Sequence, residues 1–327
     1  MIRRFLKKKS YKNELNIDLI LNGETACTKC KKNMVLKEYS PLTFSKCQHC
    51  GEYNFIPMTV KKYCLYHPLG GGGMGTVYKA IDLETKKLIS VKIIIQDLYS
   101  ESMSLDKIIK EYQIGKSLPI HPNLTPTLDL FSLKDNFYLV TEFVDGVRMD
   151  NAVDSDNLPP ASFVMKWTRE IADALQHIYN AGYLYRDLKP QNIIIENKTN
   201  SIKIIDFGLA KALDEPIDDN HIVEGSPEYN ITPERSSFQK EDVYSEIYSL
   251  GMVMYFCFTG KPFFYSESAH DLVNLHKHKL RVRDVSSKLI NVDPKICKMI
   301  EKMIKKNPMD RYISYDDFIK DLNKITI

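Results

Sequence analysis

Hydrophobic residues change their spacing along this chain. Short runs of β-type residues come first: 63–69 and 76–82 lie on either side of a group of glycines, and 88–95 follows. The run that starts at Phe137 has the same character. Runs of this kind, bounded by turn residues, predict strands, and the first two predict a hairpin.

Apolar residues with helical spacing mark a second kind of segment. One helix is expected over 104–118, and another between Pro160 and Gly182, which suit the start and the end of a helix. Three more helices are expected towards the C-terminus, over 244–258, 296–304 and 318–322. Strands are therefore predicted mainly in the first half of the chain and helices mainly in the second.

Composition limits the class of protein. The chain of 327 residues has room for roughly two domains. A content of 43% hydrophobic and 27% charged residues is ordinary for a globular protein with a full core. The longest strongly apolar run, 250–258, is too short to span a bilayer, and the basic start, 1–9, lacks the apolar region of a secretory signal. We therefore expect a cytoplasmic protein without a membrane span.

Charge is unevenly distributed. The net charge is +3, but residues 1–62 hold 13 Lys and Arg against 5 Asp and Glu, whereas 63–327 holds 32 against 37. The basic N-terminal segment is expected to meet an acidic partner, and the acidic remainder of the same chain is one candidate.

Four of the seven cysteines are spaced like the ligands of a zinc module. Cys27 and Cys30 form one Cys-x-x-Cys pair, Cys47 and Cys50 form the other, and 16 residues separate the pairs. Two such pairs can close a tetrahedral four-thiolate site. Gly51 follows the second pair, where the chain must turn tightly. We expect a small zinc ribbon with a structural metal, because four thiolates leave no open position for catalysis.

Redox-active pairs and disulfides are the alternatives for these cysteines. A redox Cys-x-x-Cys normally lies in a βαβ context, which is missing here, and disulfides would require export. The lysine surplus would permit nucleic-acid binding, but the aromatic residues of the module are more simply its core. Nucleic acid is therefore not a favoured partner, although the sequence does not exclude it.

The densest chemical pattern lies at 185–192 and 206–208, which read Tyr-Arg-Asp-Leu-Lys-Pro-Gln-Asn and Asp-Phe-Gly. Phosphoryl transfer needs a carboxylate that faces the attacking hydroxyl, and an Asn and an Asp that hold Mg²⁺ on the phosphates. The two runs resemble the catalytic core of eukaryotic-type (Hanks-type) Ser/Thr protein kinases. The resemblance implies that Asp187 orients the substrate hydroxyl and accepts its proton, and that Lys189 stabilises the γ-phosphate. Asn192 and Asp206 would bind Mg²⁺ or Mn²⁺.

Further landmarks of that family occur in order along 63–143. A glycine run alone is weak support, but here strands flank it, so its backbone could cover the phosphates of ATP. Its glycines are Gly70, Gly71, Gly72, Gly73 and Gly75. Lys92 resembles the family lysine that grips the α- and β-phosphates, and Glu111 is expected to pair with it.

The resemblance also implies an adenine site. Glu142 and Val144 would offer backbone groups to the edge of the base. Val77 and Ser90 would cover one face of the base, and Ile194 the other.

Three positions depart from the family pattern. Tyr185 replaces the usual His and is expected to support the Asp-Phe-Gly backbone. Glu246 stands where an Asp normally accepts backbone N–H groups of the catalytic loop. Thr232 replaces Ala in the Ala-Pro-Glu motif, whose acid, Glu234, is expected to form a buried ion pair with Arg311.

The segment after Asp-Phe-Gly is acidic. In the family, an arginine in the place of Arg186 is usually satisfied by a phosphate on this segment, yet 209–225 contains no Ser, Thr or Tyr. We hypothesise that one of its carboxylates replaces the phosphate, with a plain acidic surface loop as the alternative. The candidates are Asp214, Glu215, Asp218, Asp219 and Glu224. Ser226 is expected to bridge Asp187 and Lys189.

The resemblance covers 63–327 and implies an α+β, bilobal protein-kinase fold. A β-rich small lobe is expected over about 63–143 and a helical large lobe over about 147–327, with ATP and Mg²⁺ between them. Residues 1–62 would form the basic segment with its zinc ribbon, as in bacterial kinases that carry an N-terminal four-cysteine motif. The expected activity is transfer of the γ-phosphoryl group of ATP to Ser or Thr of protein substrates. A nucleotide-binding pseudokinase scaffold and a regulator led by the zinc ribbon are the alternatives.

Overall fold

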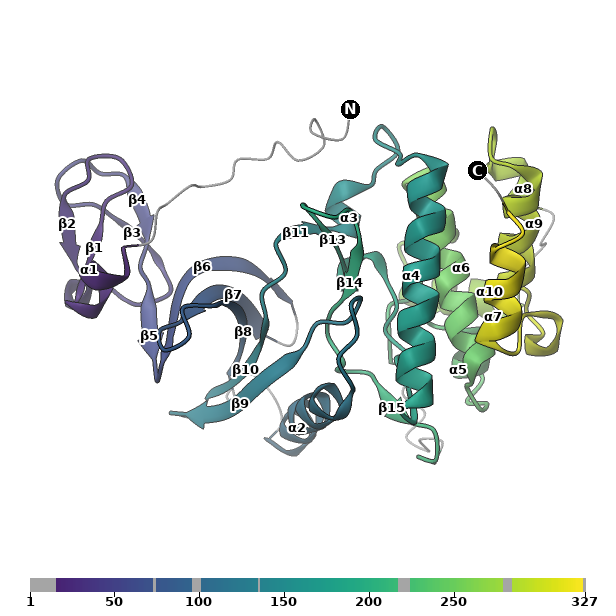
Figure 1. Ribbon diagram of the computed structural model, residues 1–327, viewed down its shortest axis with the longest axis horizontal. Helices are drawn as coiled ribbons and strands as arrows, with labels where there is room; N and C mark the ends of the chain where they lie inside the picture. Colours follow the sequence, from purple (N-terminus) through teal and green to yellow (C-terminus); the bar gives the residue numbers. More distant parts are fainter. Residues whose placement is uncertain are drawn as a thin grey trace. The chain divides into compact units, whose positions relative to one another are not determined.

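The computed structural model describes residues 16–72, 75–95, 101–134, 136–216, 224–278 and 284–325, and Figure 1 labels its elements. The chain divides into two compact units that alternate along the sequence. We call them the strand unit, Lys7–Tyr112 with Pro126–Phe143, and the helical unit, which includes Gln113–Thr125 and Val144–Ile327.

The strand unit begins with the four-cysteine module. Its elements are α1 (Ile17–Leu21), β1 (Glu24–Ala26), β2 (Asn33–Val35), η2 (Leu36–Glu38), β3 (Phe44–Lys46) and β4 (Tyr53–Phe55). β1 pairs with β2, and β3 with β4, both in antiparallel hairpins. Cys27, Met34, Cys47 and Ile56 form a small buried core, so the module is built around two of its own cysteines.

Six antiparallel strands form the main sheet, in the order β5-β6-β7-β8-β10-β9. They are β5 (Met58–Val60), β6 (Tyr63–Gly72), β7 (Gly75–Asp82), β8 (Leu88–Ile95), β9 (Thr127–Leu133) and β10 (Asn136–Glu142). The predicted hairpin is confirmed as β6–β7, and the other two predicted strands as β8 and β10. β5 lies within the segment 1–62, so the sheet begins before residue 63.

The four-cysteine module packs against this sheet. Leu42 contacts the buried residues of the sheet core, and Leu36 packs on a second cluster that includes Cys64 and Ile81. The ring of Phe55 lies 6.1 Å from that of Tyr78 on β7. The module and the sheet therefore share apolar contacts instead of being joined by a linker alone.

The junction of the module with the sheet also carries charge pairs. Lys62 lies 3.0 Å from a carboxylate oxygen of Glu84 and 3.4 Å from one of Asp82. Lys61 lies 4.1 Å from the centre of the Phe131 ring. Basic residues at the end of the segment 1–62 thus contact acidic and aromatic residues of the sheet.

The helical unit consists of helices packed around one large core, and Figure 1 shows α4, α6, α9 and α10 gathered in it. Its main helices are α4 (Ala161–Asn180), α6 (Val243–Thr259), α7 (Ala269–His278), α9 (Pro294–Met303) and α10 (Tyr315–Leu322). Shorter helices are α3 (Met149–Ala152), α5 (Pro233–Ser236), α8 (Asp284–Lys288), η4 (Pro190–Asn192) and η5 (Pro308–Asp310). The predicted helices over 244–258, 296–304 and 318–322 are confirmed as α6, α9 and α10.

α6 is the central helix of this unit. Asp242 and Ser245 form a capping box at its start, and Gly260 ends it with a left-handed φ of 68°. A Cβ on Gly260 would lie 2.2 Å from the backbone of Asp154. The sequence therefore sets both ends of the helix that carries Glu246.

Two small sheets position the loops between these helices. β11 (Gly146–Arg148), β13 (Ile193–Glu196) and β14 (Ile202–Ile204) form the first, and β12 (Tyr183–Leu184) pairs with β15 (Lys211–Ala212) in the second. The loop with the densest chemical pattern thus lies between β12 and β13. α2 (Glu101–Ser117) agrees with the helix predicted over 104–118. Within the described ranges, none of the helices has the length and apolar character needed to cross a membrane.

Candidate active site

The catalytic-loop residues predicted from the sequence converge on Asp187, whose side chain is buried in the helical unit. Lys189 Nζ lies 2.9 and 3.0 Å from the two carboxylate oxygens of Asp187. Asn192 donates its amide to the same carboxylate at 2.7 Å. Asn230, which the sequence did not indicate, donates to it at 2.9 Å. These donors hold the carboxylate in a single orientation.

The electrostatics of Asp187 suit a group that can receive a proton. Burial raises the pKa of Asp187, and the nearby charge of Asp206 raises it further. The positive charge of Lys189 and the bond from Asn192 act in the opposite direction. The side chain is therefore a carboxylate whose basicity is increased by burial and limited by its lysine neighbour.

Tyr185 supports the backbone of the Asp-Phe-Gly run and the residue before it. The Tyr185 hydroxyl donates to the Ile205 carbonyl at 2.7 Å, and its ring meets that of Phe207 edge to face at 6.0 Å. Asp206 has a left-handed φ of 68° and accepts the Gly208 N–H at 2.9 Å. The expectation that Tyr185 supports this backbone is confirmed.

Arg186 also has a left-handed backbone, with φ 65°. Its N–H donates to Oε1 of Glu246 at 2.7 Å, so the predicted acceptor role of Glu246 is confirmed. Its guanidinium binds Glu241 at 2.8 Å. We had expected a carboxylate from 209–225 to bind Arg186. This expectation was wrong for the described candidates Asp214, Glu215 and Glu224, because the acid that binds Arg186 is Glu241, which lies beyond that segment. The other two candidates, Asp218 and Asp219, lie outside the described residues.

The expectation for Ser226 was wrong. Its hydroxyl donates to Glu228 at 2.9 Å, and its N–H donates to the Asn230 side chain at 2.7 Å. Asn230 then reaches Asp187. A short-range bond to the acid two residues later takes the Ser226 hydroxyl away from Asp187, and a buried amide makes the contact instead.

The ion pair predicted between Glu234 and Arg311 is confirmed. The two groups lie 2.6 Å apart, and both side chains are buried. Arg311 also donates to the backbone carbonyls of Tyr244 and Lys306. This pair ties the segment after 225 to the C-terminal helices, away from Asp187.

In the strand unit, Lys92 on β8 and Glu111 on α2 form the predicted ion pair. The Nζ of Lys92 lies 3.0 Å from Oε2 and 3.3 Å from Oε1 of Glu111. The two side chains are only 14% and 8% exposed. A paired lysine at this depth is available as a fixed positive charge for phosphate groups.

The register of the sheet places two of the other predicted ATP-binding residues, Val77 and Ser90, near Lys92. Val77 is the cross-strand partner of Lys92, and Ser90 lies two residues before Lys92 on β8. Side chains at such positions share one face of a sheet. Glu142 ends β10 of the same unit, whereas Val144 and Ile194 belong to the helical unit.

The glycine run lies at the tip of the β6–β7 hairpin. Gly70, Gly71 and Gly72 end β6, Gly75 begins β7, and Gly73 lies outside the described residues. Gly75 has φ 127°, and a Cβ there would lie 2.3 Å from the Ile93 carbonyl oxygen. Close backbone approach at this tip therefore requires glycine.

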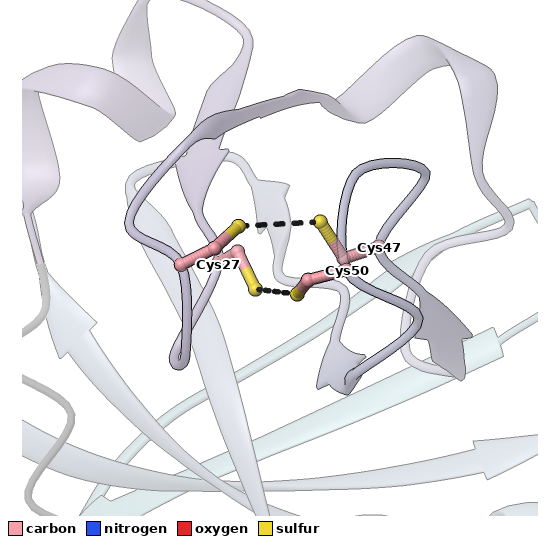
Figure 2. Close-up of side chains that lie close together, drawn as sticks. Cys27, Cys47 and Cys50 are labelled. Carbon is pink, nitrogen blue, oxygen red and sulfur yellow. Dashed lines mark hydrogen bonds between the residues drawn. The ribbon is translucent and has the colours of Figure 1, made fainter.

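The four cysteines converge at the tips of the β1–β2 and β3–β4 hairpins. Figure 2 shows Cys27, Cys47 and Cys50 pointing toward one another. The sulfur atoms of all four lie within 4.8 Å of one another. Cys27 and Cys50 are separated by 3.6 Å, and Cys30 and Cys47 by 3.7 Å.

The two cysteine turns have the same backbone geometry. In each, the N–H four residues after the first cysteine donates to that cysteine's carbonyl, from Lys31 to Cys27 and from Gly51 to Cys47. Lys31 and Gly51 both adopt a left-handed φ, of 61° and 75°. This is the tight turn that the sequence indicated at Gly51.

The arrangement fits a tetrahedral zinc ion. With Zn–S bonds of about 2.3 Å, neighbouring thiolates would be separated by roughly 3.8 Å. Asn54 donates its amide to the Cys27 sulfur at 3.4 Å, as an outer-shell partner would. Burial opposes ionisation of Cys27, but the N–H groups of Cys30 and Lys29, together with hydrogen bonds from Asn54 and Cys50, outweigh it and lower the pKa to about 6. A thiolate is thus favoured at this position.

Comparison with known proteins shows that this chain is similar to protein kinases. The family model described as "Protein kinase domain" matches residues 63–321. The chain is 30% identical to serine/threonine-protein kinase PrkC of Bacillus subtilis (strain 168) over 264 residues, which is 80% of this chain and 40% of that protein. Serine/threonine-protein kinase PknB of Mycolicibacterium smegmatis is 30% identical over 271 residues, 81% of this chain and 43% of PknB.

The similarity extends to a eukaryotic protein. Serine/threonine-protein kinase ULK3 of Homo sapiens is 27% identical over 266 residues, 80% of this chain and 54% of ULK3. The chain thus spans about two fifths to half of the length of the relatives that it matches.

Proposed function

Because this chain belongs to the protein kinase family, we propose that it transfers the γ-phosphoryl group of ATP to Ser or Thr hydroxyls of protein substrates. The observation that carries the proposal is the buried carboxylate of Asp187, held by Lys189, Asn192 and Asn230. A hydroxyl that approaches this carboxylate would be oriented by it and could pass its proton to it. Lys189 would then contact the transferred phosphoryl group.

The remaining residues would bind nucleotide and metal. Asn192 and Asp206 supply the amide and carboxylate oxygens that suit Mg²⁺, which would neutralise charge on the phosphates. Lys92, fixed by Glu111, would contact the α- and β-phosphates. The glycine tip of β6–β7 would lie over the phosphates, and Val77, Ser90, Glu142, Val144 and Ile194 would surround the adenine.

We also propose that the four-cysteine module binds one structural zinc ion. The support is the near-tetrahedral spacing of the four sulfur atoms and the absence of a fifth ligand among the described residues. No disulfide joins any of the seven cysteines. The contacts of Leu36 and Leu42 with the sheet suggest that the module's first partner is its own chain.

The activity is tested by Mg²⁺-dependent transfer of labelled phosphate from ATP to a mixed-sequence protein acceptor. Asp187→Asn keeps the size and hydrogen-bonding capacity of the side chain but cannot accept a proton, so kcat should fall by about 10²- to 10⁴-fold. Asp206→Ala should abolish Mg²⁺-dependent transfer, because a metal ligand is lost.

The matched control is Asp173→Asn, which removes an exposed carboxylate that pairs with His121 away from the loop. Its activity should equal that of the wild type. A folded wild-type chain that binds ATP without any transfer would contradict the proposal and favour a scaffold role. Phosphate on tyrosine alone would contradict the acceptor class.

A further inference from the structure

The backbone of Arg186, which immediately precedes Asp187, is held on both sides. Its N–H donates to Glu246 at 2.7 Å, and its carbonyl accepts a bond from the Arg235 guanidinium at 3.0 Å. The left-handed φ of 65° is unfavourable for a residue with a Cβ. Such a conformation persists only where surrounding contacts hold it in place. We therefore expect these contacts to set the direction in which the Asp187 side chain points.

The carboxylate of Glu241 bridges the side chains of Arg186 and Arg235. One carboxylate oxygen accepts from Nε of Arg186 at 2.8 Å, and the other accepts from Nε of Arg235 at 2.9 Å. Each arginine also places a second guanidinium nitrogen 2.8 Å from the same carboxylate. Each arginine thus meets one oxygen of the carboxylate with two of its nitrogen atoms. Charge-assisted hydrogen bonds are roughly twice as strong as bonds between neutral groups.

The carboxylate is needed for charge as well as for geometry. Arg186 and Arg235 are little exposed, with side chains 16% and 5% accessible. Without an anion between them, two guanidinium groups would face each other in a poorly solvated region. Their repulsion would weaken the hydrogen bond from Arg235 to the Arg186 carbonyl. The two positive charges also hold the pKa of Glu241 below its ordinary value although the group is buried.

Glu241 lies outside the segment that follows Asp-Phe-Gly, although its partner Arg235 also donates to the Glu224 carbonyl of that segment at 3.2 Å. It lies between α5 and the Asp242 cap of α6. By contrast, 209–225 has no Ser, Thr or Tyr that could carry a phosphate. The nearest Ser and Thr after it have other roles, since Ser226 bonds Glu228 and Thr232 caps α5, and Tyr229 between them is buried.

We propose that Glu241 is a positioning residue that sets the catalytic loop through Arg186 and Arg235, in the role that a phosphate on the segment after Asp-Phe-Gly would otherwise fill. This proposal rests on the kinase activity proposed above. It means that the chain is competent for transfer without phosphorylation of its own loop.

The test uses the full chain after phosphatase treatment, with intact mass showing that no phosphate remains. Wild type, Glu241→Gln and Glu241→Ala are compared for kcat and for KM of ATP. The wild type should be active in this state. Both variants should lose about 10²-fold in kcat, the scale expected when a reacting group is displaced by about 1 Å, whereas KM for ATP should change little.

Glu234→Gln is the matched control, because it also removes the charge of a buried glutamate that pairs with an arginine in the same unit. Its thermal midpoint should fall at least as far as that of Glu241→Gln, but its kcat should fall much less. Acetate should restore part of the kcat of Glu241→Ala, because the anion can enter the space between the two arginines. It should not restore the kcat of Asp187→Asn.

Three results would overturn the proposal. The first is a wild-type chain that becomes active only when Ser226 or Thr232 carries phosphate. The second is a Glu241→Ala variant with wild-type kcat. The third is acetate that raises the melting temperature of Glu241→Ala without raising its kcat, since Glu241 would then be structural. If the folded wild type showed no transfer in any phosphorylation state, the proposed kinase function itself would fall, and the role of Glu241 with it.

Discussion

Glu246 is a carboxyl group in an environment that disfavours its charge. Oε1 accepts the Arg186 N–H, whereas Oε2 has no hydrogen-bond partner in the part of the chain that the structure describes. Burial raises the pKa of Glu246 to about 7, although the Arg186 N–H and the charges of Arg235 and Arg186 favour ionisation. In the unfolded chain the same group would titrate at about 4.3.

This difference predicts a pH dependence of stability. Between about pH 4.3 and 7 the unfolded chain has released the proton while the folded chain retains it, so stability falls as the pH rises. At about 1.4 kcal/mol per pKa unit, the loss amounts to about 4 kcal/mol. Glu246→Gln keeps an acceptor for the Arg186 N–H but does not titrate. As the pH rises through this range, the free energy of unfolding of Glu246→Gln, measured by urea unfolding, should therefore increase relative to that of the wild type.

The exposed Glu267 provides the control. Glu267→Gln should follow the wild-type pH dependence closely. If Glu246→Gln and wild type gave parallel curves between pH 4 and 8, the buried carboxyl would not titrate as described.

At the scale of a secondary-structure element, the β6–β7 hairpin contains two glycines with different constraints. A Cβ on Gly75 would lie 2.3 Å from the backbone oxygen of Ile93, and its φ of 127° excludes most other residues. A Cβ on Gly70 would meet nothing within 4 Å. The hairpin therefore depends on glycine at one position and tolerates a side chain at the other.

Alanine substitution should separate the two positions. Gly75→Ala should lower the free energy of unfolding by about 1–3 kcal/mol, because strain cannot be relieved without moving β8. Gly70→Ala should change stability by less than about 0.5 kcal/mol or raise it slightly, since alanine reduces the freedom of the unfolded chain. Thermal and denaturant unfolding would measure both. Equal losses in the two variants would contradict the close approach of Gly75 to Ile93.

At the scale of the whole molecule, the four-cysteine module and the six-stranded sheet behave as parts of one strand unit. Leu36 packs with Cys64 and Ile81, and Leu42 packs on the sheet core. A structural zinc ion contributes its binding free energy to folding, about 10–16 kcal/mol in isolated zinc peptides. Loss of the metal should therefore destabilise the neighbouring strands of the sheet as well as the module.

Cys47→Ser, or chelation of the wild type, should remove one zinc per chain and lower the thermal midpoint. Hydrogen exchange should become faster in β6 and β7 as well as in the module. Cys297→Ser is the control, because this buried cysteine lies in the helical unit, far along the chain from the cluster, and metal content should stay at one per chain. If chelation accelerated exchange only in 16–56, the module would fold independently of the sheet.

Sequence patterns were sufficient where the chemistry is local. The spacing of Asp187, Lys189 and Asn192 within six residues leaves a tight loop few alternatives, and the structure brings the three side chains together. The paired cysteine turns are equally local, since each is closed by a bond from the fourth residue back to the first. The strands and helices followed from hydrophobic spacing for the same reason.

Prediction failed where partners come from distant segments. Glu241 lies 55 residues after Arg186 in the sequence, and no pattern distinguishes it from an exposed acid. Asn230 reaches Asp187 because the chain after Gly225 turns inward, while the Ser226 hydroxyl is taken by Glu228. In both cases the contact joins residues that are far apart in the sequence, so only the folded chain shows which side chain reaches the loop.

The sequence by itself therefore determined the cluster of Asp187, Lys189 and Asn192, the four-cysteine module, the glycine tip and most of the elements that carry them, because each rests on short-range spacing. The tertiary structure alone decided which acid neutralises Arg186, which amide supports Asp187 and how the module joins the sheet. Those contacts depend on burial and charge among residues that only the folded chain brings within hydrogen-bonding distance.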